Sequence, residues 1–572
     1  MAAAMVTEDW YELERASEGT AAVGVLEHGT RDPDANVVWR GEGLLGVVYG
    51  VVSNRDRLAL SWGDLFRGVA DESRDTLARL DGPFALACVD TRAGAVHLAT
   101  DKAGSRPLYY VAGGDGAADG VAFSSELGPL VAERAAPTLD ARAVGALLLF
   151  GGVLGERTLV EGIASLPPAT RVTVDDEVSV ERYWEPTAAG LAPSSYPDRW
   201  LADYRRALAD VATTAGDRSL WFPGDADSRI AATVLADRSL PVRTLTAGGR
   251  PDGDREAAAQ TAARLGVPNE QVHDDPDHHL VDAVADAVAA TDGMVAWSTV
   301  EAIEYATGRL HDDADVLVHG DAALGAATWT GAVGAGDSVA SALYENERVL
   351  PAGTVRDLLA ADVDPLDSVA SLVAASVDGP AERTAVDAAG RVRAATELRS
   401  RAVQRRQVGT RTVASGALID TAARMPPAYR VGTRPISAPV GSGTPPIRRA
   451  VRERLDPALA RIPAGPPSGE STGTAAPGGG SAGWSPAAEI GDPYVRRYAA
   501  DGRFRRFVDD LLDGAGDRAP LDEDAVAALR DRLAADDLST FAPVAALTGL
   551  ELWARRHLDD DTAARGRSAV EV

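Results

Sequence analysis

The chain has very little cysteine and lysine, with one residue of each among 572. A single thiol, Cys88, cannot form an intramolecular disulfide or a cysteine-based structural zinc site. Long apolar runs are also missing: the longest, Gly145 to Leu154, is about half the length of a membrane span. The first residues lack the basic start and apolar segment of a signal peptide. We therefore expect a cytoplasmic protein that does not associate with membranes.

The charge is strongly one-sided, because 85 acidic residues face 57 basic ones and the formal net charge is −28. The acids are mainly aspartate, and the bases are arginines with one lysine, Lys102. Such a surface repels phosphate backbones and anionic lipids, so we expect no nucleic-acid partner. Excess aspartate with almost no lysine is typical of a salt-loaded cytoplasm, where salt screens the self-repulsion. We expect a halophilic protein, in which acidic clusters are weak evidence of a metal site.

The length allows more than one domain, because single hydrophobic cores stop growing near 250–300 residues. Up to residue 190, short apolar stretches at close spacing predict the strands of an antiparallel, sheet-rich domain. These stretches are 47–53, 84–90, 95–100, 106–111, 120–125 and 169–174. A Pro/Ser-bearing stretch at 186–197 predicts a linker.

The pattern changes between residues 191 and 462, where apolar strand candidates alternate with Ala-rich helical segments. The strand candidates are 219–222, 242–247 and 315–320, and the helical segments include 227–238 and 254–266. This alternation predicts βαβ units in a parallel sheet, with the chemistry at the carboxyl ends of the strands.

The remaining chain divides into two parts. Residues 463–487 are rich in Gly, Pro, Ser and Thr and cannot bury enough apolar surface to offset the entropy of ordering, so we expect a disordered insertion. Residues 488–572 show helical periodicity and predict a packed helical end.

Several segments in order carry a family resemblance. In the first part they are 77–110, 122–131, 157–172 and 182–184. In the second part they are 221–231, the Gly-Asp pair at Gly320, 417–427 and 550–558. The chain resembles the glutamine-hydrolysing asparagine synthetases. That resemblance implies an N-terminal Ntn-hydrolase-like antiparallel sandwich, the class II glutamine amidotransferase fold. It also implies a parallel-sheet ATP-pyrophosphatase domain of the adenine nucleotide α-hydrolase type, which uses ATP and Mg²⁺ to adenylate a carboxylate before ammonia displaces AMP.

The nucleophile that the resemblance implies is missing. The family's glutaminase uses a cysteine at residue 1 of the mature chain, with its free α-amine as the base. Here Met1 precedes an alanine, and a start at Met5 would expose Val6. Cys88 lies inside a strand-like segment, where a small buried hydrophobic residue is the usual interpretation. We therefore expect an inactive glutaminase.

The glutamine pocket also departs from the family. The family's Asn-Gly-Glu loop reads Tyr49-Gly50-Val51 here, so only the glycine remains. Asp101 matches an acid that holds the glutamine amine, although a turn acid is an equal interpretation. Gly50 and Asp101 are the predicted remnants of this pocket.

The pyrophosphate loop of the family, Ser-Gly-Gly-x-Asp-Ser, reads Pro-Gly-Asp-Ala-Asp-Ser at 223–228. Small residues let backbone N–H groups reach the phosphates at a helix N-terminus. By resemblance, Gly224, Asp225, Asp227 and Ser228 would bind ATP or pyrophosphate. Asp225 either repels pyrophosphate or holds a metal ion, since two unit charges at ~4 Å interact by about 4 kcal/mol. Asp227 and Ser228 alternatively only cap the helix that follows.

The second family loop, Gly-Glu/Asp-Gly-x-Asp-Glu, keeps only Asp321. Asp321 is either a remnant catalytic and metal ligand or a turn residue at the end of a strand. With Asp227 it forms the weak metal-site prediction, because alanines replace the other acids and cannot hold magnesium.

The family also uses a lysine in the synthetase domain to stabilise charge on the reacting phosphate, but the only lysine here lies in the first part. The arginines that could replace it are Arg434, Arg448 and Arg449.

Two functions remain open. The first is an ATP-dependent carbon–nitrogen ligase that joins ammonia or a substrate amine to a small-molecule carboxylate. The family includes β-lactam synthetases and lasso-peptide cyclases, which also lack the first cysteine. The second is a non-catalytic descendant used for nucleotide sensing or for binding a protein partner. The first is favoured by the retained residues Gly224, Asp227, Ser228 and Asp321. The second is favoured by Pro223 and Asp225, by the absent acid pair and by the missing lysine.

Overall fold

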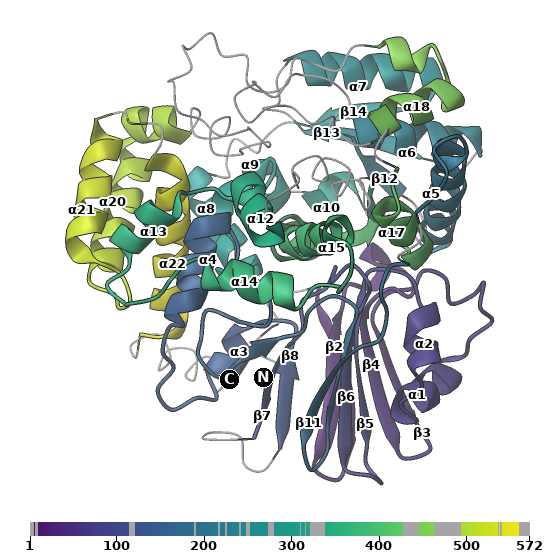
Figure 1. Ribbon diagram of the computed structural model, residues 1–572, viewed down its shortest axis with the longest axis horizontal. Helices are drawn as coiled ribbons and strands as arrows, with labels where there is room; N and C mark the ends of the chain where they lie inside the picture. Colours follow the sequence, from purple (N-terminus) through teal and green to yellow (C-terminus); the bar gives the residue numbers. More distant parts are fainter. Residues whose placement is uncertain are drawn as a thin grey trace.

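The structure is a computed structural model (Figure 1). It describes residues 5, 10–113, 120–187, 190–214, 218–222, 226–238, 242–247, 252–272, 279–308, 310–314, 316–320, 338–426, 429, 446–462, 494–535, 537 and 540–559. Below, "N-terminal part" means the described residues up to 187, and "C-terminal part" means those from 190 onward. Gly224, Asp225, Asp321, Arg434 and the predicted insertion at 463–487 lie outside the described residues.

The N-terminal part is built on a six-stranded antiparallel sheet with the order β11-β10-β6-β5-β4-β3. Its strands are β3 (Val37–Gly41), β4 (Leu44–Gly50), β5 (Phe84–Asp90), β6 (Ala95–Thr100), β10 (Thr170–Val174) and β11 (Val178–Arg182). The sequence predicted β5 and β6 with these bounds. The stretch predicted at 47–53 lies three residues later than β4, because the apolar pattern of the sequence continues past the bend at Gly50 (φ +96°).

Smaller layers cover both faces of this sheet. One face packs against β1 (Glu12–Glu18) and β2 (Ala21–Glu27) and against β7, β8 and β9 (Tyr109–Ala112, Val121–Ser124 and Ala164–Ser165). The other face packs against α1 (Trp62–Ala70) and α2 (Arg74–Arg79). Side chains alternate along a strand, so in β5 Ala87 faces the strands and Cys88 faces the helices. The predicted antiparallel sandwich is confirmed.

The helices α3 (Gly128–Val131) and α4 (Ala141–Phe150) lie between β8 and β9 in the N-terminal part, and α5 (Tyr196–Thr213) is the first helix of the C-terminal part. The longest apolar run of the sequence falls at the end of α4, which packs against helices of the C-terminal part. The predicted linker is shorter than expected, because α5 begins at Tyr196, whose side chain is buried. Among the helices that the structure describes, none is long and apolar enough to cross a membrane.

The C-terminal part contains a five-stranded parallel sheet with the order β14-β13-β12-β15-β16. Its strands are β12 (Arg218–Trp221), β13 (Arg243–Ala247), β14 (Asn269–Val272), β15 (Val316–His319) and β16 (Gly409–Thr412). The helices α5, α6 (Ala226–Asp237), α7 (Asp252–Leu265), α17 (Gly416–Ala423) and α18 (Pro446–Leu455) accompany it. The predicted parallel sheet is confirmed.

A helical layer lies beside this sheet (Figure 1). Its helices are α8 (Leu280–Ala290), α9 (Ile303–Thr307), α10 (Leu310–Asp313), α12 (Val339–Glu347), α13 (Ala352–Leu358), α14 (Asp367–Ala374), α15 (Ala381–Arg393), α16 (Ala402–Arg405), α20 (Gly502–Gly516), α21 (Glu523–Ala534) and α22 (Phe541–His557). The helix α22 contacts α4, α8 and α20 and is buried along most of its length. The helical end of the chain is thereby packed onto the N-terminal part.

Candidate functional site

The two predicted glutamine-pocket residues flank the start of β5 at one edge of the sheet, Gly50 at the end of β4 and Asp101 directly after β6. The Asp101 carboxylate is buried and accepts backbone N–H bonds from Ala103 (2.8 Å), Ser105 (2.8 Å) and Phe84 (3.3 Å). Burial raises the pKa of Asp101 to about 6, although these N–H donors act in the opposite direction. The Asp101 carboxylate is thus held by backbone N–H groups of the turn that follows β6 and of the first residue of β5.

A residue that the sequence analysis did not single out, Arg106, occupies the space beside Gly50. A Cβ atom on Gly50 would lie 2.9 Å from Nε of Arg106 and 2.2 Å from the carbonyl oxygen of Pro83, so only glycine fits there. The guanidinium lies over the Tyr49 ring at 5.3 Å and donates to Oγ1 (3.0 Å) and the carbonyl (3.1 Å) of Thr410 in β16. An arginine that bonds to the C-terminal part therefore lies in the remnant pocket.

The only thiol is remote from this pocket. Cys88 is fully buried on the helix-covered face of the sheet, with Sγ 3.8 Å from the carbonyl oxygen of Phe66. Burial raises the pKa of Cys88 to about 12. A thiol protonated at neutral pH is a poor nucleophile, so Cys88 is not placed to act as a glutaminase nucleophile.

The predicted pyrophosphate-loop residues that the structure describes are Asp227 and Ser228, both buried in the first turn of α6. The helix begins at Ala226, so they lie inside it. Arg448 of α18 forms a bidentate ion pair with Asp227, with Nε–Oδ1 at 2.7 Å and Nη2–Oδ2 at 2.5 Å. The structure brings these two predicted residues together, whereas the adjacent Arg449 lies exposed on α18.

The end of β15 lies against the same helix. The Tyr204 hydroxyl donates to the carbonyl oxygen of Gly320 at 2.7 Å, and a Cβ atom on Gly320 would lie 2.4 Å from Cβ of Ala231 in α6. The rings of Trp221, at the end of β12, and His319 are 6.4 Å apart. The start of α6 and the ends of β12 and β15 therefore converge on one region.

This region, as far as it is described, does not fit a magnesium site. Both carboxylate oxygens of Asp227 accept bonds from Arg448. Across the described ranges, no three His, Cys, Asp or Glu side chains are grouped so that they could hold a metal ion.

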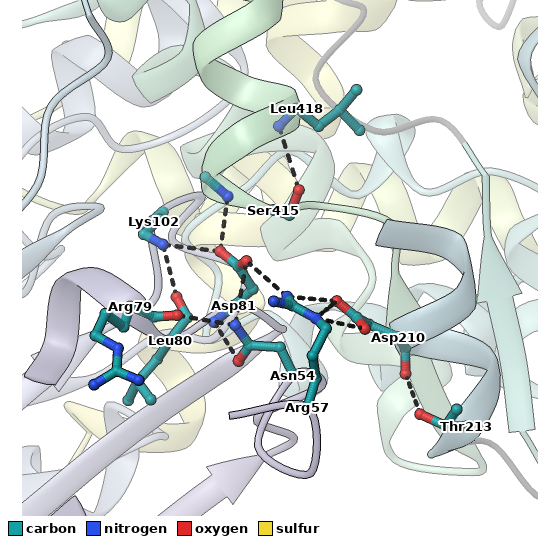
Figure 2. Close-up of polar contacts among 11 residues, drawn as sticks. Asn54, Arg57, Arg79, Leu80, Asp81, Lys102, Asp210, Thr213, Ser415 and Leu418 are labelled. Atoms are coloured by element: carbon teal, nitrogen blue, oxygen red, sulfur yellow. Dashed lines mark hydrogen bonds and ion pairs between the residues drawn. The ribbon is translucent and has the colours of Figure 1, made fainter. Parts of the chain in front are cut away.

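The single lysine lies between the two parts of the chain (Figure 2). Nζ of Lys102 donates to the carbonyl of Leu80 (2.8 Å) and to Oδ1 of Asp81 (2.8 Å). The same Oδ1 accepts the backbone N–H of Gly416, at the start of α17, at 2.8 Å. Nearby, Arg57 donates to Asp210 of α5. Lys102 thus joins the N-terminal part to α17.

A protein-family model matches the part of the chain that contains Asp101 and Arg106, but not Gly50. Residues 65–184, from within α1 to just past β11, match the model described as a glutamine amidotransferase domain. The N-terminal part contains a glutamine amidotransferase domain. The match includes Cys88, Asp101, Lys102 and Arg106. The chain has no match among the curated proteins.

Proposed function

We propose that this chain is an asparagine-synthetase-like protein whose amidotransferase domain has lost glutamine hydrolysis and whose parallel sheet binds an adenine nucleotide. Activity of the carbon–nitrogen ligase type would then use ammonia or a substrate amine and a small-molecule carboxylate. The loss of hydrolysis is supported by the buried thiol and by Arg106, whose side chain occupies the space beside Gly50.

The strand order supports the nucleotide proposal. Numbered from β12 along the chain, the sheet order is 3-2-1-4-5, so the direction of winding reverses between β12 and β15. Ligands of open parallel sheets bind outside the carboxyl ends of the strands at this switch point. In the sequence, the predicted residues 223–228 follow β12 and extend into the first turn of α6, and Asp321 follows β15.

The ion pair between Asp227 and Arg448 is the observation that carries the proposal. Arg448 is 19% exposed and is held beside the N-terminus of α6, where helix N–H groups favour an anion. A guanidinium binds phosphate in the same bidentate geometry as a carboxylate. We expect ATP phosphates to compete with Asp227 for Arg448.

The same ion pair also favours the second candidate, a non-catalytic descendant. Asp227 is satisfied by an arginine, and the single lysine is bound to Asp81 between the two parts. In that case the pair only stabilises the fold, and nucleotide does not bind.

Thermal unfolding with and without Mg-ATP in potassium chloride separates these candidates. Because a ligand stabilises only the state that binds it, ATP at 100-fold its Kd stabilises the parent by about 2.7 kcal/mol. We expect Arg448→Ala to lose this shift and the exposed neighbour variant Arg449→Ala to keep it. The absence of a shift in the parent would contradict nucleotide binding and favour the non-catalytic descendant.

A further inference from the structure

Two arginines from different parts of the chain are buried side by side where the parts meet. Arg106 comes from the loop after β6 and is 3% exposed, and Arg405 ends α16 and is 6% exposed. The phenol rings of Tyr49 and Tyr109 adjoin them. We refer to these four side chains as the arginine chamber.

Some donors of the chamber are satisfied by protein oxygens. Both terminal nitrogens of Arg106 donate to Thr410. Nη1 of Arg405 donates to the carbonyl oxygens of Leu398 (3.1 Å) and Ser105 (3.5 Å). These acceptors are neutral, so they leave both positive charges uncompensated.

Other donors have no acceptor. By hydrogen-bond geometry, Nε of Arg106 and Nε and Nη2 of Arg405 are buried without an acceptor among the described residues, and the neutral Tyr49 hydroxyl interacts with Arg405 from this side. The buried hydroxyl of Tyr109 is likewise without a partner in the described part of the chain. Buried donors of this kind are rare in native proteins and point to a bound water or ion.

The nearby carboxylates do not neutralise the chamber. Asp32 forms an ion pair with Arg411 at 2.5 Å, and Asp101 is held by its own turn. Burial and the charge of Arg405 lower the pKa of Arg106 to about 10, so both guanidiniums remain charged at neutral pH. Two buried like charges without a counter-charge are strongly unfavourable. A water molecule could accept the hydrogen bonds but would not supply the charge.

We propose that the arginine chamber binds a small inorganic anion, chloride. A monatomic anion accepts from several donors without fixed directions, which suits three N–H groups and one hydroxyl. The bound anion bridges Arg106 and Arg405, and so stabilises the docking of the amidotransferase domain on the C-terminal part. This inference does not depend on nucleotide binding.

Anomalous diffraction from crystals grown in bromide tests the location directly. We expect a bromide peak between the guanidiniums of Arg106 and Arg405. Bromide found only at the protein surface would overturn the proposal. This measurement uses the unaltered protein.

Thermal unfolding in potassium chloride and in potassium gluconate, at equal potassium concentration, tests the energetics. We expect the parent to have the higher Tm in chloride, with a saturating dependence, and Arg405→Gln to lose that difference. The control, Arg182→Gln, breaks another ion pair between the two parts, with Asp387, and should keep the difference. Equal Tm values for the parent in both salts, or an unchanged difference in Arg405→Gln, would overturn the proposal. If Arg405→Gln does not fold, the bromide peak decides.

Discussion

Asp292 is a buried acid at the boundary between the two parts, and it links folding to pH. Its carboxylate accepts the backbone N–H of Leu127 at 2.9 Å. Burial, with the charge of Glu126, raises the pKa of Asp292 to about 7. In the unfolded chain the carboxyl loses its proton near pH 4. Between these values the folded state binds more protons, so this residue makes stability fall as the pH rises from about 4 to about 7.

Asp292→Asn removes this proton linkage and keeps an acceptor oxygen for Leu127. We expect the free energy of unfolding of the variant, relative to the parent, to increase with pH by up to about 1.4 kcal/mol per unit between pH 4 and 7 and to level off above. Chemical denaturation at pH 5, 6, 7 and 8 measures this. The contribution of His557 has the opposite sign, because burial lowers its pKa to about 4, but it is common to both proteins. A difference that does not change with pH would contradict the assignment.

The sequence predicted some site residues and missed others for definite reasons. It assigned Asp227 and Arg448 separately to the nucleotide site by resemblance, and the contact between them depends on how α18 packs on α6. It gave no signal for Arg106 or Arg405, because arginine is the background base of this chain. Their importance comes from burial, which no local pattern predicts.

The contact between the loop after α2 and the start of α17 joins two elements that are far apart in the sequence (Figure 2). Asp81 accepts bonds from Lys102 and from the first N–H of α17. Ser415 caps the same helix by accepting the N–H of Leu418. The Lys102 and Asp81 side chains are 6% and 13% exposed, so this ion pair is largely shielded from solvent.

We expect Lys102→Met to destabilise the protein by about 3–5 kcal/mol, because it leaves the largely buried Asp81 charge without its closest cation and with only the longer ion pair to Arg57 at 3.9 Å. Arg40→Ala is the control, since the Arg40 and Glu18 side chains are 59% and 38% exposed and such a pair is worth about 1 kcal/mol or less. Urea denaturation of the parent and both variants measures the difference. Equal losses in the two variants would show that the Lys102 contact does not hold the parts together.

Two strands of the parallel sheet that were not predicted from the sequence are mostly polar. β14 and β16 read Asn-Glu-Gln-Val and Gly-Thr-Arg-Thr, which have no apolar run, yet β16 is buried throughout. Its polar groups are satisfied by the N-terminal part, as in the bonds from Arg106 to Thr410 and from Arg411 to Asp32. By contrast, β5 is buried on both faces, and its continuous apolar run identified it from the sequence alone.

For the molecule as a whole, acidic residues dominate the composition, and the formal net charge is −28. Several basic side chains are nevertheless buried where the two parts meet. Ion pairs cross that boundary from Arg182 to Asp387 and from Arg411 to Asp32. The amidotransferase domain is therefore held to the parallel sheet by charged contacts, and Arg106 extends from its remnant pocket into this boundary.

The release of glutamate from glutamine by the purified protein, in molar potassium chloride, tests most directly whether this amidotransferase domain is inactive. The account predicts no release by the parent or by Cys88→Ala, because the single thiol is buried with a raised pKa and Arg106 occupies the space beside Gly50. Release by the parent that Cys88→Ala abolishes would make Cys88 the nucleophile, and release that survives this substitution would reveal another one. Either result would contradict the loss of glutamine hydrolysis.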